Sequence, residues 1–208
     1  DKADVLSRLK RVADKIEHAR DCDHLRGLEG QAAADYFRAL PQVFNATVAQ
    51  MPEFKFHNRN RRPPADPVNA CLSLSYAVLT RTWASALSIA GLDPWKGLYH
   101  AERPGRPALA LDMIEPWRPL LADSAILMAL NNGEIEAGDF IYSAGGCNLR
   151  PKARKALIAA FERRLDQQAT HPVFGYTISI RRTLHVQARL LVRFFLGELP
   201  DYPHYMPR

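Results

Sequence analysis

Apolar residues recur at helical spacing through most of this 208-residue chain, and this periodicity constrains the fold more than any other feature. Near the start, Val5, Leu9, Val12 and Ile16 lie three or four residues apart, so we expect residues 3–20 to form an amphipathic helix. The chain has 11 glycines and 15 prolines, which suits helices joined by proline-marked turns better than a many-stranded sandwich. The sequence therefore predicts an all-α fold of six to eight helices.

Further helices are expected on the same grounds at 25–40, 68–90, 151–168 and 176–196. Helical spacing also runs through 108–129, but Pro116 and Pro119 interrupt it, so we expect a kink or two helices there. Residues 41–66 are expected to be irregular, and Phe140 to Tyr142 to form a short strand. At about 150 residues per domain, we interpret residues 1–208 as one helical domain.

Composition excludes several classes of protein. Apolar residues make up 47% and charged residues 24%, as in a globular chain, and no apolar run approaches the ~18 residues of a membrane helix. Cys22, Cys71 and Cys147 are widely separated and form no Cys-x-x-Cys pair, which argues against a zinc ribbon or a disulfide scaffold. We expect them to be buried, reduced thiols of a cytoplasmic protein. Because the chain opens on Asp1 rather than Met, we expect a processed product or part of a longer polypeptide.

Positive charge is concentrated in one part of the chain. The net charge is +6, yet residues 150–193 alone hold ten Lys and Arg against Glu162 and Asp166. A basic block of this kind is typical of proteins that bind a polyanion, although a solvated helix face has the same composition. A second basic stretch, rich in aromatic residues, spans 54–62.

Two isolated residues are candidates for metal-assisted chemistry. Glu29 stands between Gly27 and Gly30, whose small size would let a substrate or another backbone approach the carboxylate; the alternative is a surface glutamate on a helix. His100 precedes a loop rich in proline and glycine, and the alternative there is an ordinary polar histidine.

A pair of carboxylates forms the third candidate. Asp112 and Glu115 are three residues apart, so both lie on one helix face, among apolar neighbours that indicate partial burial. Two buried carboxylates are costly without a counter-ion. A divalent cation would remove that cost, and Arg118 would do so as a purely structural partner.

Several short strings, in order, resemble one known family. They are Arg-Gly-Leu-Glu-Gly at 26–30, Arg-Asn-Arg-Arg-Pro-Pro at 59–64, Asp-Pro-Val-Asn-Ala at 66–70, Gly-Leu-Tyr-His at 97–100 and Leu-Asp-Met-Ile-Glu-Pro-Trp-Arg-Pro at 111–119. Together they resemble the helical catalytic domain of CRISPR-associated protein one, the spacer-acquisition integrase. The resemblance runs from about residue 25 to the end of the chain.

The resemblance implies a metal-dependent DNA endonuclease and integrase, which inserts spacer DNA into a CRISPR array by phosphodiester transesterification. Its motifs place the catalytic metal ligands at Glu29, His100 and Glu115, with Asp112 as a second-shell group or alternative ligand. The implied metal is Mg²⁺ or Mn²⁺. One imidazole with two carboxylates suits Mn²⁺ at least as well as Mg²⁺, which prefers oxygen ligands.

The implied partners are the spacer precursor and CRISPR repeat DNA, a second integrase copy in a homodimer, and the small CRISPR-associated protein two. We expect phosphate contacts from basic residues of both stretches: Lys55, Arg59, Arg61, Arg62, Lys152, Arg154, Arg181 and Arg182. The family's N-terminal β-rich domain is not recognisable in this chain. We therefore expect a truncated form or the terminal part of a fusion, with a reverse transcriptase or another adaptation nuclease.

Two other functions compete with this interpretation. A non-catalytic helical module would use the basic block to bind DNA and leave the acids and the histidine incidental. An RNA-cleaving helical domain would use an Arg-x6-His motif, which Arg11 and His18 satisfy literally. Cleavage that depends on a 2′-hydroxyl and survives chelation would distinguish the second.

Overall fold

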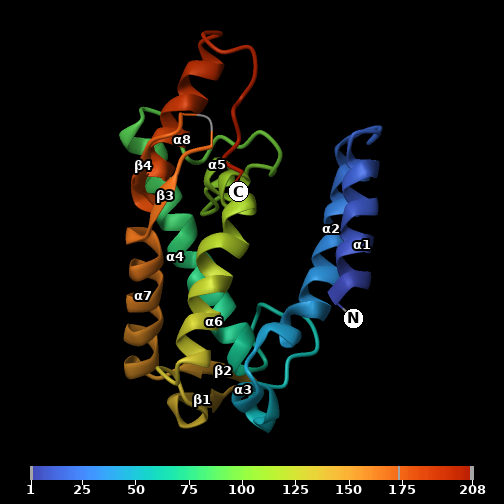
Figure 1. Ribbon diagram of the computed structural model, residues 1–208, viewed down its shortest axis with the longest axis vertical. Coiled ribbons are helices and arrows are strands. Elements are labelled where there is room, and N and C mark those ends of the chain that lie inside the picture. The colour runs from blue at the N-terminus through green and yellow to red at the C-terminus, as the bar shows by residue number, and fades with distance from the viewer. Residues whose placement is uncertain (1, 173, 207–208) are drawn as a thin grey trace. The chain divides into compact units, whose positions relative to one another are not determined.

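The computed structural model describes residues 2–172 and 174–206, and within these ranges it is a helical protein with two small sheets (Figure 1). The all-α prediction is confirmed, and the described residues form eight α-helices. The helices are α1 (Lys2–Ile16), α2 (Cys22–Ala39), α3 (Ala46–Gln50), α4 (Pro67–Ile89), α5 (Ala108–Ile114), α6 (Ser124–Asn131), α7 (Pro151–Asp166) and α8 (Ile180–Phe195). The strands are β1 (Phe140–Ser143), β2 (Gly146–Leu149), β3 (Gln168–Thr170) and β4 (Thr177–Ser179).

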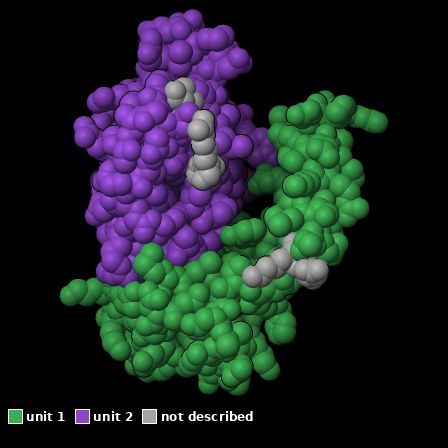
Figure 2. Space-filling model, in the orientation of Figure 1, with its two compact units in different colours: residues 1–73, 127–156 green, residues 74–126, 157–208 purple. Residues whose placement is uncertain are grey.

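The chain divides into two compact units, coloured separately in Figure 2. Unit 1 comprises residues 1–73 and 127–156, and unit 2 comprises residues 74–126 and 157–208. Helices α4, α6 and α7 contribute residues to both units. In unit 2, one face of α4 carries Leu79, Trp83 and Leu87 at four-residue spacing, and all three side chains are fully buried.

In unit 1, α1 confirms the helix predicted over 3–20, although it ends at Ile16, and it packs against α2. Val5 and Val12 of α1 and Leu28 of α2 are buried. The guanidinium of Arg8 adds a polar contact, with its Nε 3.5 Å from Oδ1 of the buried Asp35 on α2. These contacts make α1 and α2 a helical pair.

Helix α3 lies within the stretch that we expected to be irregular. Asn45 caps it, because its Oδ1 accepts a hydrogen bond from the Val48 amide at 2.9 Å. The Asn45 Nδ2 also donates to the carbonyl of Asn131 at 2.8 Å. Five residues are too few to show helical periodicity, so the capping residue was the available sequence signal.

The proline-interrupted segment breaks as predicted. Helix α5 ends at Ile114, Glu115–Trp117 forms a 3-10 turn, and Arg118–Asp123 forms a π-helical turn before α6 begins. Pro116 and Pro119 lack an amide hydrogen, so the regular helical hydrogen bonds cannot continue through them. The expected short strand is also confirmed, because β1 pairs in antiparallel register with β2.

The helix expected over 176–196 begins later than predicted. Thr177–Ser179 instead forms β4, which pairs with β3. Ser179 then caps α8 through its hydroxyl, which accepts a hydrogen bond from the Arg182 amide at 3.3 Å. The prediction missed this hairpin because strands of three residues carry no alternating pattern long enough to recognise.

The cysteines behave in two ways. Cys71 and Cys147 are buried, as expected, and burial raises the pKa of both thiols, which keeps them protonated and unreactive. Cys22 is exposed, so the prediction of burial is wrong for it. It is the first residue of α2, directly after the capping Asp21, on a turn that faces solvent. Within residues 2–172 and 174–206, no helix combines the length and the apolar character needed to cross a membrane.

Candidate active site

The loop between α4 and α5, residues 90–107, is folded tightly against the start of α5. The Pro94 carbonyl accepts hydrogen bonds from the amides of Leu109 and Ala110, at 3.0 and 3.3 Å. A Cβ at Gly97 would lie 2.4 Å from the His100 carbonyl oxygen and 2.6 Å from the Cβ of Ala108. The chain can make this close approach only with glycine at position 97.

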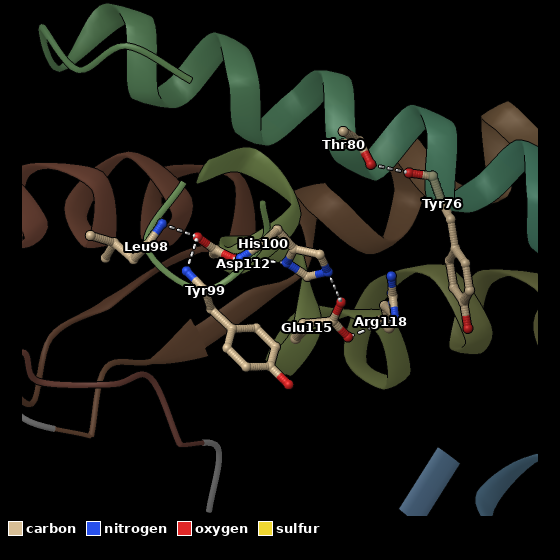
Figure 3. Close-up of polar contacts among 8 residues, drawn as sticks. All are labelled: Tyr76, Thr80, Leu98, Tyr99, His100, Asp112, Glu115 and Arg118. Atoms are coloured by element: carbon tan, nitrogen blue, oxygen red, sulfur yellow. Dashed lines mark hydrogen bonds and ion pairs between the residues drawn. The ribbon is translucent and has the colours of Figure 1, made fainter. Parts of the chain in front are cut away.

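The carboxylate of Asp112, on α5, binds the middle of this loop (Figure 3). Its Oδ2 accepts hydrogen bonds from the amides of Leu98 at 2.7 Å and Tyr99 at 3.1 Å. Its Oδ1 accepts from the His100 amide at 2.9 Å. Three consecutive amides thus converge on one carboxylate, whose side chain is only 10% exposed.

The imidazole of His100 lies between the two acids of α5 and its following turn (Figure 3). Its Nδ1 is 2.7 Å from Oδ1 of Asp112. An ionised carboxylate can only accept, so Nδ1 is the donor in this hydrogen bond, and Nε2 is the ring nitrogen that remains for another partner. That Nε2 faces Oε1 of Glu115 at 4.0 Å. The histidine is therefore oriented with its basic nitrogen towards the second carboxylate.

Arg118 is the partner of Glu115 rather than of Asp112. Its Nη1 donates to Oε2 of Glu115 at 2.6 Å, and the Cζ of its guanidinium lies 4.9 Å from the centroid of the Tyr76 ring on α4. The Tyr76 hydroxyl donates to Oδ1 of the buried Asp123 at 2.9 Å. This chain of contacts secures the glutamate at the point where the helix changes to a 3-10 turn.

Part of the expected ligand set is brought together in unit 2. His100, Asp112 and Glu115 all belong to this unit, whereas Glu29 belongs to unit 1. Among the residues that the structure describes, no three His, Cys, Asp or Glu side chains form a group that could hold a metal ion. The ligand atoms of His100 and Glu115 nevertheless suit a divalent cation. Metal-binding histidines commonly donate a hydrogen bond from their other ring nitrogen to a carboxylate, as His100 does to Asp112.

Glu29 is half-buried on α2, one residue after the buried Leu28. A Cβ placed on Gly27 or on Gly30 would meet no atom of the described chain within 4 Å. No packing contact in the structure therefore requires glycine at these two positions. The interpretation that they allow a substrate to approach Glu29 stays a prediction.

Six of the expected phosphate-binding residues are exposed: Lys55, Arg61, Arg62, Lys152, Arg154 and Arg182. Three, the exposed Lys152 among them, contact groups within the protein. Arg59 donates to the side chains of Asn69 at 2.8 Å and Ser73 at 3.1 Å, and Lys152 lies 3.7 Å from Asp139.

Arg181 is the third engaged residue. Its Nη2 lies 2.6 Å from Glu162 and 2.9 Å from Asp166, which are the two acids of the basic block.

The structure also describes the Arg-x6-His pair on which the RNA-cleaving alternative depends. Arg11 is exposed on α1, and Nδ1 of His18, just beyond that helix, is 3.2 Å from the Asp14 carbonyl.

The sequence analysis did not identify the groups that contact and support Tyr76 and Trp117 next to the site. Asp123 and Tyr205 were not singled out, yet Asp123 anchors Tyr76, and the ring of Tyr205 stacks on Trp117 at 4.9 Å with 14° between the planes. The available sequence signal was weak: an acid eight residues after Glu115 and a tyrosine in a proline-rich tail.

Comparison with known protein families gives a match over most of the chain. The family model described as CRISPR associated protein Cas1 matches residues 1–163. A Cas4/Cas1 fusion from Rhodospirillum rubrum, named as a CRISPR-associated exonuclease and endonuclease, is 66% identical over 98% of this chain and 35% of its own length. An endonuclease Cas1 from Thermus thermophilus is 44% identical over 99% of this chain and 60% of its own length. The chain thus spans between about a third and three-fifths of these relatives.

Solved structures share the fold. A casposase bound to its integration product superposes with a TM-score of 0.83 at 21% identity, covering 100% of this chain and 58% of that one. A partial complex described as Cas6-RT-Cas1 with Cas2 superposes with a TM-score of 0.82 at 28% identity, covering 99% of this chain and 59% of that one.

Proposed function

Because the chain belongs to the Cas1 family of CRISPR-associated proteins, we propose that it is the catalytic part of a DNA endonuclease and integrase. Its reaction would be the insertion of spacer DNA into a CRISPR array by phosphodiester transesterification. The chain spans 35% and 60% of the two relatives described above, so the activity, the DNA substrates and the partners of the whole protein are all part of this proposal.

One observation carries the proposal. Asp112 holds the proton of His100 on Nδ1 and so directs the basic Nε2 towards Glu115, 4.0 Å away. An imidazole and a carboxylate presented together, with the tautomer set by a third group, are an arrangement typical of metal-assisted chemistry.

The metal in this proposal is Mg²⁺ or Mn²⁺, held by Glu29, His100 and Glu115. When bound, such an ion stabilises negative charge on the phosphate and lowers the pKa of the attacking hydroxyl. The protein's own residues set the conditions. Asp112 accepts the proton on Nδ1 of His100 and so orients the ring with Nε2 towards Glu115, and Arg118 holds the Glu115 carboxylate through Oε2 at 2.6 Å. Glu29 is included in this ligand set because of its sequence motif.

The proposed partners are spacer and repeat DNA, a second copy of the integrase and Cas2. The titles of the structural neighbours support this set, because one is a casposase bound to an integration product and another contains Cas1 together with Cas2. The exposed Lys55, Arg61, Arg62, Arg154 and Arg182 would supply phosphate contacts.

A non-catalytic DNA-binding module is the second candidate, and the short ion pair between Glu115 and Arg118 favours it. In that case Glu115 would serve only to balance a guanidinium that is 20% exposed. The two candidates differ in one respect: both bind DNA, but only the integrase joins strands.

The deciding experiment measures joining of a 3′-hydroxyl DNA end to a CRISPR repeat, by the full protein with its partner, with Mg²⁺ or Mn²⁺ and with EDTA. We expect joining that needs the metal and is abolished in Glu29→Gln, His100→Ala and Glu115→Gln. Glu102→Gln is the matched control, because Glu102 lies in the same loop but is 57% exposed and pairs with Lys96 at 3.7 Å. Retained joining in Glu115→Gln would contradict the proposal, and DNA binding without any joining would favour the non-catalytic module.

A further inference from the structure

The segment that follows α5 departs twice from regular helical geometry. Glu115–Trp117 is a 3-10 turn, and Arg118–Asp123 is a π-helical turn. Pro116 and Pro119 lack amide hydrogens, so fewer hydrogen bonds within the segment define its backbone. Single π-helical turns of this kind occur frequently at functional sites. The position of the Glu115 side chain therefore depends on contacts from other elements.

One side chain of α4 contacts both ends of the π-helical turn. The guanidinium of Arg118, the first residue of the turn, lies over the Tyr76 ring, with its Cζ 4.9 Å from the ring centroid (Figure 3). The Tyr76 hydroxyl donates to Oδ1 of Asp123, the last residue of the turn, at 2.9 Å. Tyr76 is 8% exposed and Asp123 is 2% exposed, so both contacts are shielded from water. A single tyrosine thus spans the whole turn.

These two contacts fix the direction of the Arg118 side chain. A cation within about 6 Å of an aromatic face is attracted to it, and more strongly where water is excluded. A buried hydrogen bond such as that from Tyr76 to Asp123 is costly to leave unmade. Held in this way, Arg118 directs its Nη1 at Oε2 of Glu115, 2.6 Å away. The other oxygen, Oε1, then lies on the side of His100, whose Nε2 is 4.0 Å from it.

We propose that Tyr76 is a positioning residue of the candidate active site, which acts through Arg118 to orient the Glu115 carboxylate for a divalent cation. Its action is indirect: it fixes the π-helical turn, the turn fixes Arg118, and Arg118 holds Oε2. This inference rests on the proposed function. It adds to that function a buried tyrosine on which metal affinity depends, although the tyrosine is not a ligand.

The test is a double-mutant cycle, read as the Mn²⁺ affinity of the full protein in calorimetric titrations. We expect Tyr76→Leu, which removes both contacts, to weaken Mn²⁺ binding by about 10-fold, the lower end of the usual effect of groups that support metal ligands. Tyr76→Phe keeps the ring beside Arg118 and should cause a smaller loss. In an Arg118→Leu background, Tyr76→Leu should cause no further loss, because the guanidinium through which it acts is absent.

Thr80→Val is the matched control. Thr80 lies one turn after Tyr76 on α4, and its hydroxyl donates to the Tyr76 carbonyl at 2.7 Å (Figure 3). Its replacement removes a hydrogen bond within α4 but neither contact with the π-helical turn, so Mn²⁺ affinity should not change. Circular dichroism verifies that each variant is folded, and DNA affinity measured without metal should be equal in all of them. If Tyr76→Leu does not fold, Tyr76→Phe replaces it in the same cycle.

The outcomes separate this inference from the proposed function. If the wild-type protein binds Mn²⁺ and Tyr76→Leu binds it equally well, the positioning proposal is wrong and the integrase proposal stands. A loss that persists in full in the Arg118→Leu background, or that is matched by a loss of DNA affinity, would also overturn it, because Tyr76 would then support the fold in general. A wild-type protein that binds neither Mn²⁺ nor DNA would instead contradict the proposed function itself.

Discussion

At the residue scale, two acids three positions apart have different contacts. The Asp112 carboxylate accepts hydrogen bonds from the amides of Leu98, Tyr99 and His100 and from the His100 ring. Glu115 is 29% exposed and faces the histidine and Arg118. Asp112 therefore shapes the loop and orients the His100 ring, while Glu115 presents oxygens that a cation can share. This difference favours Glu115 over Asp112 as the ligand.

The first prediction compares the two conservative variants. We expect Glu115→Gln to abolish Mn²⁺ binding, because it removes a charged ligand. We expect Asp112→Asn to weaken binding by about 10- to 100-fold, the usual cost of losing a carboxylate that orients a ligating histidine. Calorimetric titration with Mn²⁺ measures both. The assignment is reversed if Asp112→Asn loses the metal outright while Glu115→Gln keeps it.

At the element scale, the β3–β4 hairpin and the C-terminal segment meet at a buried histidine. His171 is fully buried, its amide donates to the Tyr176 carbonyl at 2.9 Å, and its Nε2 is 3.3 Å from Nε2 of Gln187 on α8. Its ring lies 5.7 Å from that of Tyr205, which stacks on Trp117 in the turn after Glu115. The hairpin, α8 and the tail thus support the turn that presents the glutamate.

The second prediction concerns the stability of these elements at acid pH. Burial lowers the pKa of His171 below its ordinary value of 6.5. The unfolded chain then binds the proton more readily than the folded protein does. The contribution of the neutral, buried His171 to the free energy of unfolding is therefore complete above pH 6.5 and falls as the pH drops through the lowered pKa. We expect the wild-type melting temperature to decrease between pH 8 and pH 5 more than that of His171→Gln. An equal decrease in both proteins would show that His171 does not cause it.

At the scale of the whole molecule, the positive charge of the basic block is only partly available to DNA. Both of its acids, Glu162 and Asp166, pair with Arg181. Arg164 is also engaged, donating to the Leu120 carbonyl and the Ser124 hydroxyl, each at 2.8 Å. Arg182, which follows Arg181 on α8, is exposed. A count of basic residues therefore overstates the number of phosphate contacts.

The third prediction uses Arg181 and Arg182 as a matched pair. If Arg182 neutralises one phosphate, Arg182→Ala should reduce the slope of log affinity against log salt by about one. Arg181→Ala should leave the slope nearly unchanged, because its charge is already balanced by two carboxylates. Fluorescence anisotropy over a series of salt concentrations measures both slopes. A larger change in Arg181→Ala would mean that its ion pairs open when DNA binds.

The sequence predicted the features that depend on neighbours along the chain. Apolar spacing located the long helices, such as α4, since one buried face imposes a period of 3.6 residues. Pro116 and Pro119 predicted the break after α5, because they lack the required amide hydrogens. The shared face of Asp112 and Glu115 followed from their spacing alone.

The tertiary structure decided what depends on segments distant in sequence. Whether Arg118 would bind Asp112 or Glu115 was open, and the loop settles it, because the amides of residues 98–100 occupy Asp112. The hairpin of β3 and β4 has strands too short for any pattern, so only pairing between them defines it. The sequence thus determined the helices and the candidate residues, because both depend on local periodicity and motif. The tertiary structure decided each residue's partner, because a hydrogen bond depends on distance in space and not along the chain.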